Sequence, residues 1–194
     1  MRIIAGELKG RRLKTRAGLL TRPTSDKVKG AIFSTLGEKV RDASVLDLFA
    51  GTGNLALEAL SRGARAAVLV ENNREAQAVI RENIEMTGVG HKAKLISMDA
   101  FQYIQKNRSE IFDLIFLDPP YGGGFAQKAI TLLKEKTCLT ANGVIVAETA
   151  KDEIIEGEIS PLEIRRISNY GDTRVWYLQR SDVCRDRMSD EEEV

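Results

Sequence analysis

Short apolar runs alternate with amphipathic stretches through the middle of the chain. The runs predict strands at residues 44–49, 66–71, 93–98, 112–118 and 143–148. The intervening stretches predict helices near residues 54–62, 73–86, 100–107 and 124–136. Strands that alternate with helices in this way are typical of a parallel sheet with helices packed against it. We therefore expect an α/β fold for the central part of the chain.

The two ends of the chain depart from this alternation. They predict a small hairpin of residues 2–5 and 11–14, a helix after residues 21–26, and two strands at residues 162–168 and 173–179. The helix is indicated by capping residues and by apolar positions that recur at helical spacing from Val28 to Leu36. The last two strands would add an antiparallel hairpin to the parallel sheet.

The chain is long enough for one large domain, or one domain with a small extension, without disulfides. Its 194 residues allow a core that buries roughly 70% of the unfolded surface. Cys138 and Cys184 are far apart and lack the spacing of metal ligands. No apolar run approaches the ~20 residues that span a bilayer, and the start is charged too early for a signal peptide. We expect a cytoplasmic protein.

The formal net charge of +1 conceals a strong asymmetry. Residues 1–30 contain nine Lys or Arg and two Asp or Glu, whereas the remainder contains twenty and twenty-six. A basic segment on a mildly acidic body indicates nucleic-acid binding, with a solvated basic face as the alternative. The last fourteen residues hold six acids and two arginines, and they predict a solvated tail or a mimic of RNA phosphates. We predict a basic extension at 1–40, a main domain at 41–180 and an acidic flexible tail at 181–194.

Four of the predicted strands carry an acid at or next to their ends. These acids are Asp47, Glu71, Asp99 and Asp118. Because parallel strands end at one edge of a sheet, where open α/β folds bind their ligands, we expect the four carboxylates to surround a ligand. The alternative is that each acid caps the following helix or forms an ion pair.

A glycine-containing loop, residues 47–54, joins the first core strand to a helix. Glycines there let the backbone approach a ligand closely, and Glu71 lies twenty residues after Gly51, where an acid can bind ribose hydroxyls. This spacing fits a nicotinamide dinucleotide or S-adenosylmethionine. The collected acids favour S-adenosylmethionine, which carries an amine, a ribose and a sulfonium, because they would repel a pyrophosphate.

Asp118-Pro119-Pro120-Tyr121 follows the apolar run of residues 114–117. The residue before a proline is pushed to extended geometry, and neither proline has an N–H. A carboxylate, a free carbonyl and an aromatic ring suit a flat base that carries an exocyclic amine. We predict that Asp118 and the Pro119 carbonyl accept the amine hydrogens and that Tyr121 stacks on the base.

These residues resemble the class I S-adenosylmethionine-dependent methyltransferases that modify exocyclic amines. The blocks at residues 22–33, 47–53, 58–64 and 112–122 are similar to the RsmD family, which methylates N2 of one guanine in bacterial small-subunit ribosomal RNA. The resemblance runs from Met1 to about Arg180. It implies a Rossmann-like fold with a mostly parallel seven-stranded sheet, a C-terminal antiparallel hairpin and a small N-terminal hairpin and helix.

The same resemblance implies roles for individual residues and S-adenosylmethionine as the cofactor, with no metal. Catalytic residues would be Asp118, Pro119, Pro120 and Tyr121. Cofactor-binding residues would be Asp47, Phe49, Ala50, Gly51, Thr52, Gly53, Asn54, Glu71, Asn72, Asp99, Ala100 and Asp118. RNA-binding residues would be Arg11, Arg12, Lys14, Arg16, Arg22, Thr24 and Lys27. The substrate would be small-subunit ribosomal RNA within an assembled or partly assembled subunit.

Other functions stay open at this point. The target could be adenine N6 or cytosine N4 in RNA or DNA. A nicotinamide-dependent reductase is the rival enzyme, and a non-catalytic RNA-binding assembly factor is the rival that lacks an activity.

Overall fold

A seven-stranded sheet forms the centre of the molecule. The computed structural model describes residues 1–15, 26–107, 109–136 and 138–181. Within these ranges the strands are β1 Ser44–Leu48, β2 Ala66–Glu71, β3 Ala93–Ser97, β4 Phe112–Leu117, β5 Leu139–Ala150, β6 Leu162–Tyr170 and β7 Thr173–Arg180. Their order is β3-β2-β1-β4-β5-β7-β6. The first five are parallel, and β7 and β6 add an antiparallel hairpin, which confirms the predicted fold class.

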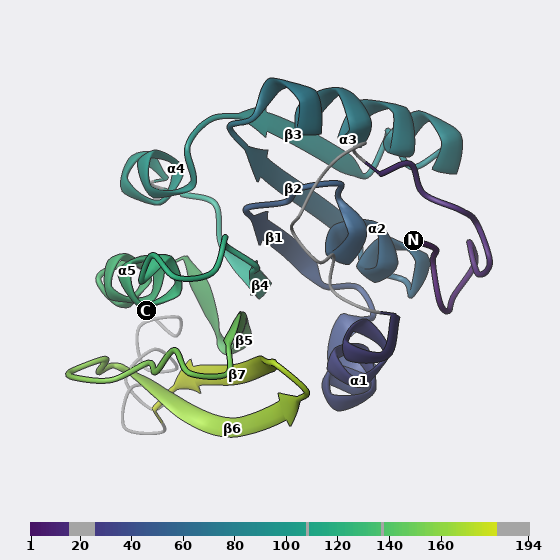
Figure 1. Ribbon diagram of the computed structural model, residues 1–194. Coiled ribbons are helices and arrows are strands. Elements are labelled where there is room, and N and C mark those ends of the chain that lie inside the picture. The colour runs from purple at the N-terminus through teal and green to yellow at the C-terminus, as the bar shows by residue number, and fades with distance from the viewer. Residues whose placement is uncertain (16–25, 108, 137, 182–194) are drawn as a thin grey trace, which may run out of the picture.

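Helices cover both faces of this sheet (Figure 1). They are α1 Asp26–Leu36, α2 Asn54–Ser61, α3 Arg74–Thr87, α4 Ala100–Lys106 and α5 Phe125–Lys134, with a short 3-10 helix, η1, at Gly37–Val40. Apolar residues of α1, α2 and α3 form one buried cluster with the sheet, and those of α4 and α5 form the other. No helix in the described ranges is both long and apolar enough to cross a membrane.

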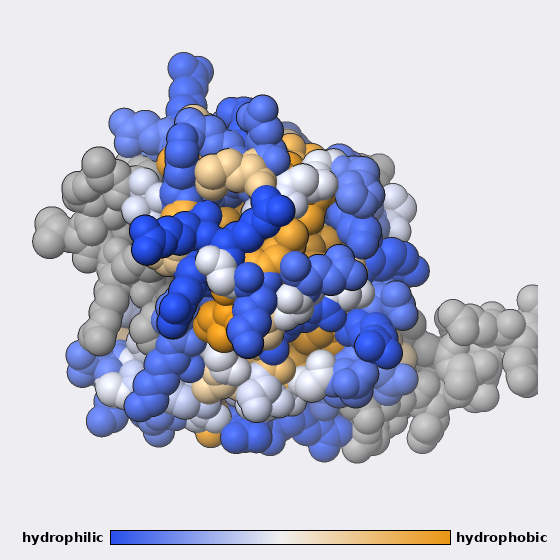
Figure 2. All heavy atoms as spheres, turned by 90° about the vertical axis from the view of Figure 1, so that its right-hand side faces the viewer, coloured by the Kyte–Doolittle hydropathy of each residue, from blue (hydrophilic) through white to orange (hydrophobic). Residues whose placement is uncertain are grey.

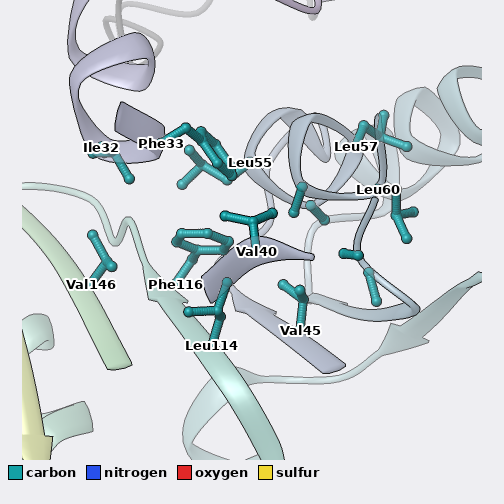
Figure 3. Packing of buried hydrophobic residues seen from close by; sticks show 14 of the residues in the cluster. Ile32, Phe33, Val40, Val45, Leu55, Leu57, Leu60, Leu114, Phe116 and Val146 are labelled. Carbon is teal, nitrogen blue, oxygen red and sulfur yellow. The ribbon is translucent and has the colours of Figure 1, made fainter. Parts of the chain in front are cut away.

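The packing of α1 and α2 on β4 holds the N-terminal part of the molecule against the sheet. Figure 3 shows Phe33 of α1, Leu55 of α2 and Phe116 of β4 pointing toward one another. The rings of Phe33 and Phe116 have centroids 5.6 Å apart, and both are buried. Burying a side chain of this size contributes about 1.5–3 kcal/mol, so this contact fixes α1 firmly.

Residues 1–15, which we call the arm, pack on α2 and α3. The predicted hairpin is present, with an antiparallel bridge between Arg2 and Arg12 and a hydrogen bond of 2.9 Å from the Ile3 N–H to the Arg11 carbonyl. The N–H groups of Ile4 and Ala5 donate to the Glu58 carboxylate of α2, at 2.7 and 3.0 Å. Figure 2 views the molecule from the side of Figure 1 on which the arm and α1 lie, where hydrophilic side chains surround a central strip of apolar residues.

A buried ion pair ties the arm, α1 and α2 together. Lys29 of α1 is fully buried, and its Nζ donates to the Arg2 carbonyl and to Asn54 Oδ1, both at 2.6 Å. It lies 3.1 Å from Glu58, which also accepts from Arg62 Nε. Burial lowers the pKa of Lys29, and the Glu58 charge opposes this. The pair joins three segments that the sequence separates.

The predicted domain boundaries can be compared with the positions of these elements. Helix α1 is followed directly by η1, which ends at Val40, where the N-terminal extension was expected to stop. Of the predicted tail, residues 182–194 lie outside the described residues. The extension, main domain and tail therefore stay a prediction as functional units.

Candidate active site

The glycine loop connects β1 to α2 through residues in left-handed backbone conformation. Phe49, Gly51 and Gly53 have φ angles of 64°, 57° and 78°. A Cβ on Gly53 would lie 3.0 Å from the Leu69 side chain, so this position also needs a small residue. Phe49 bears a steric cost of about 1–2 kcal/mol for this conformation. Such strain gathers at functional sites, so the loop is shaped for more than a turn.

Three of the predicted acids, Asp47, Glu71 and Asp118, lie close enough beside this loop for their charges to interact. Asp47 is 1% exposed, and its Oδ2 accepts from the Ala56 N–H at 3.1 Å. The pKa of Asp47 is raised to about 8, mainly by burial and to a smaller extent by the charges of Asp118 and Glu71, while the Ala56 hydrogen bond lowers it. Burial therefore favours the neutral form of Asp47 up to a higher pH than for a carboxyl in water. A cation beside it would favour its ionised form.

Glu71 connects the end of β2 to the glycine loop. Its Oε2 accepts from the Gly51 N–H at 2.9 Å, and its Oε1 accepts from the Asn73 N–H at 2.8 Å. The neighbouring Asn72 is exposed. The carboxylate thus lies beside the loop backbone, and its role in binding a ribose stays a prediction.

Asp99 lies at the same sheet edge but performs a local task. It is the N-cap of α4, and its Oδ1 accepts from the Gln102 N–H at 3.0 Å. The helix-capping alternative therefore describes this acid. Ala100, the next residue, is buried. A role for the Asp99–Ala100 pair in contacting an adenine ring stays a prediction.

An aromatic cluster, which sequence reasoning missed, links the glycine loop to α4 and α5. The ring of Phe49 packs edge-on against Phe101 at 5.6 Å, and Phe101 lies 6.1 Å from Phe125. Lys128 Nζ lies 4.2 Å above the Phe101 ring. These residues are distant in sequence and share no motif, so only the fold brings them together.

The Asp118–Tyr121 segment leaves the end of β4 with its aromatic ring held by the hydroxyl. Tyr121 donates to Glu148 Oε1 at 2.9 Å and lies 3.2 Å from Thr173 Oγ1, while the residue is 44% exposed. Burial raises the pKa of the Tyr121 hydroxyl, and the charges of Glu148 and Asp118 raise it further. Tyr121 therefore stays neutral and anchored at one end.

Glu148 is a fifth acid at the carboxyl edge, and the sequence analysis overlooked it. It is 3% exposed near the end of β5, and Tyr121 bonds to it. The signal was present, because the strand predicted at 143–148 ends in this acid after an apolar run. Beside Tyr121 lies a pocket of about 510 Å³, lined by Tyr121, Ala150, Lys151, Asp152, Asp172 and Arg174.

The residues predicted to bind RNA divide into two groups. Arg11, Arg12, Lys14 and Lys27 are exposed. Arg11 donates to the Met86 carbonyl, and Lys14 pairs with Glu82, so both bonds attach the arm to α3. The other three, Arg16, Arg22 and Thr24, lie outside the described residues.

Comparison with known proteins places this arrangement in a family. The family model described as "Conserved hypothetical protein 95" matches residues 1–179. The chain belongs to this family. The RsmD resemblance is confirmed, since a Haemophilus influenzae member named "Ribosomal RNA small subunit methyltransferase D" is 34% identical over 155 residues, which are 79% of this chain and 80% of the relative.

Two further members of the family extend the match over most of the chain. A Bacillus subtilis relative is 37% identical over 177 residues, which are 90% of this chain and 96% of that protein. A solved structure from Escherichia coli superposes with a TM-score of 0.83 at 30% identity and covers 93% of this chain and 98% of its own. The Escherichia coli structure therefore shares most of the architecture described above.

Proposed function

We propose that this protein transfers a methyl group from S-adenosylmethionine to the exocyclic N2 of a guanine in small-subunit ribosomal RNA. The observation that carries the proposal is the Asp118–Tyr121 segment at the end of β4, beside a buried acid and a glycine loop. The name of the Haemophilus influenzae relative supports both the methyl transfer and the ribosomal RNA. The choice of guanine N2 rests on the RsmD resemblance.

The residues around the glycine loop fit the cofactor. S-adenosylmethionine supplies an electrophilic methyl group on a sulfonium when it is bound. Loop 47–53 would hold its methionine part, Glu71 its ribose, and Asp99 with Ala100 its adenine. The buried Asp47 carboxyl, whose pKa is raised to about 8, fits a cationic ligand because ionisation beside a cation would repay its burial.

Asp118 and the Pro119 carbonyl would prepare the amine for attack. The guanine N2 is a poor nucleophile because its lone pair is delocalised into the ring. When both hydrogens are accepted, the nitrogen moves toward a tetrahedral shape, and the negative charge of Asp118 favours the positive charge that develops. Tyr121 would stack on the base, a contact typically worth ~1–3 kcal/mol. Its hydroxyl bond to Glu148 would set the angle of the ring.

RNA would approach through the basic arm and α1. A base in structured RNA must leave its stack to reach a pocket at the sheet edge, so contacts to the surrounding backbone have to offset that cost. Arg12 and Lys27 are exposed on these two elements and suit phosphate contacts. The partner in this proposal is an assembled or partly assembled small subunit.

The decisive variant is Asp118→Ala. We expect it to retain the affinity for S-adenosylhomocysteine in calorimetry and to lose at least ~10²-fold in methyl transfer, the scale of one key electrostatic group. The assay uses labelled S-adenosylmethionine with unmodified small subunits, and mass spectrometry locates the methylated nucleotide. Glu38→Ala, which alters an exposed acid on η1, is the matched control and should leave transfer unchanged.

Each alternative function predicts a different result in the transfer, thermal-stability or RNA-binding measurement. Near-normal transfer by Asp118→Ala would refute the role of that carboxylate. A methylated adenine or cytosine would overturn the guanine assignment. Thermal stabilisation by a nicotinamide dinucleotide instead of S-adenosylhomocysteine would favour the reductase. RNA binding by the unaltered protein without any transfer would favour an assembly factor.

A further inference from the structure

Asn83 of α3 joins the arm to the glycine loop through a single side-chain amide. Its Oδ1 accepts from the Lys14 N–H at 2.8 Å. Its Nδ2 donates to the Lys14 carbonyl at 3.1 Å and to the Thr52 carbonyl at 2.9 Å. The residue is fully buried. One amide thus holds the backbone of a segment predicted to bind RNA and the backbone of a segment predicted to bind the cofactor.

The chemistry of this amide makes the link specific. A primary amide has two N–H donors, and here each goes to a different main-chain carbonyl. Because Asn83 is buried, a broken bond would leave a polar group without water to replace its partner. The Lys14 and Thr52 peptides therefore have to keep their positions together.

Neighbouring contacts reinforce the same connection. Leu13 is buried in the core cluster that also contains Ile80 of α3. Lys29 makes a similar connection at Asn54, the first residue of α2. Its Nζ donates both to the Arg2 carbonyl of the arm and to Asn54 Oδ1. Two buried polar side chains therefore tie the arm to the two ends of the short stretch from Thr52 to Asn54.

We propose that Asn83 is a positioning residue that couples RNA binding on the arm to cofactor binding in the glycine loop. This inference rests on the proposed function. A ligand that orders the Thr52 peptide also restrains the Lys14 peptide, so the second ligand meets an arm that is already ordered. By linkage, S-adenosylhomocysteine tightens RNA binding, and RNA tightens S-adenosylhomocysteine binding by the same factor.

The test compares RNA affinity with and without saturating S-adenosylhomocysteine. The probe is unmodified small-subunit ribosomal RNA with a fluorescent end label, read by anisotropy. For the unaltered protein we expect about a tenfold increase in affinity, within the usual range of coupling between sites. For Asn83→Asp we expect a ratio near one, because the carboxylate keeps the acceptor for the Lys14 N–H and loses both donors.

Thr87→Val is the matched control on the same helix. Thr87 is also buried, but its hydroxyl donates only within α3, to the carbonyls of Asn83 and Ile84. This variant removes a buried hydrogen bond without altering the arm or the loop. It should keep the coupling ratio of the unaltered protein, so a general loosening of α3 cannot reproduce the effect of Asn83→Asp.

A second pair of variants tests the link from the arm and leaves α3 intact. Lys14→Pro and Lys14→Ala both remove the ammonium charge, but only the proline removes the N–H that Asn83 accepts. Both should bind RNA more weakly, and only Lys14→Pro should lower the coupling ratio. This pair decides the question if Asn83→Asp does not fold.

The possible outcomes separate this inference from the proposed function. An unaltered protein that binds neither ligand contradicts the proposed function and this inference with it. An unaltered protein that binds both ligands with a ratio of one leaves the proposed function standing and overturns the coupling. A folded Asn83→Asp that keeps the full ratio, or equal ratios for the two Lys14 variants, also overturns it.

Discussion

One buried carboxyl beside the glycine loop, that of Asp47, has a raised pKa. Asp47 is almost fully buried, and its pKa is raised to about 8 by burial and then by the charges of Asp118 and Glu71. A neutral carboxyl at pH 7 can become a carboxylate when a cation arrives beside it. Ligand binding and proton release are then linked.

We expect the affinity for S-adenosylhomocysteine to rise between pH 6 and pH 8. The ammonium group of the ligand favours ionised Asp47, so below a pKa of about 8 binding must also release the Asp47 proton, which weakens it. Calorimetry at pH 6, 7 and 8 in buffers of different ionisation enthalpy measures both the affinity and the proton released. Asp47→Asn cannot ionise and should show no proton release.

Binding by the unaltered protein that is independent of pH and releases no proton would contradict this assignment. Above pH 8 Asp47 is ionised before the ligand arrives, so the affinity should level off. The position of that plateau therefore reports the pKa of Asp47 in the protein without ligand.

The elements of the fold follow largely from the apolar pattern, and the exceptions have physical causes. The start of β5, from Leu139 to Gly143, has the composition of a turn, yet Leu139 pairs with Phe112 beyond an irregularity in β4. The hairpin of the arm could be predicted from its own residues, but its place on the molecule could not, because the Ile4 and Ala5 N–H groups find their acceptor on α2. Non-local pairing decided both segments.

In the candidate site, too, local patterns predict some residues, and contacts between distant segments decide the others. Acids at the ends of strands are visible in the sequence, because each interrupts an apolar run. Tyr121 is visible, but its bonds to Glu148 and Thr173 depend on β7 lying beside β5, a pairing that no local pattern encodes. Asn83 lies mid-helix without a motif, and only the packed arm gives it a role.

At the level of helix packing, the Lys29–Glu58 pair should dominate stability. Lys29→Met removes the ammonium from the buried Glu58 carboxylate, which keeps Arg62 and two backbone N–H groups as partners, so we expect a loss of about 3 kcal/mol in the free energy of unfolding, the lower end for a broken buried pair. Lys94→Met, which breaks an exposed pair with Glu110, should cost less than about 1 kcal/mol. Urea denaturation of both variants measures the difference, and equal losses would show that the buried pair has no special weight.

The net charge divides along the chain, because basic residues outnumber acidic ones in the first thirty residues and acidic ones outnumber basic ones in the remainder. Arg12 is exposed on the arm, whereas Arg65 is exposed just before β2, at the amino end of the sheet. We expect Arg12→Ala to weaken RNA binding and to reduce the slope of log affinity against log salt by about one phosphate contact. Arg65→Ala should leave both unchanged.

Anisotropy titrations between 50 and 200 mM salt, a range chosen because phosphate contacts lose affinity steeply across it, measure both slopes. Identical slopes for the two variants would mean that the arm is a solvated basic surface. A loss of affinity without any change of slope would place Arg12 at a contact that does not involve phosphate.

The attachment of the arm has a consequence for engineering. Its bonds to α2 come from backbone N–H groups such as those of Ile4, Ala5 and Leu8, and Gly6 lies so close that an added Cβ would be 1.8 Å from the Ser61 oxygen. The scaffold of the arm is thus specified by these backbone bonds, by one glycine and by the buried side chains of Ile3 and Leu13. A library that varies its exposed side chains should retarget the enzyme to new RNA surfaces without repacking the domain beneath.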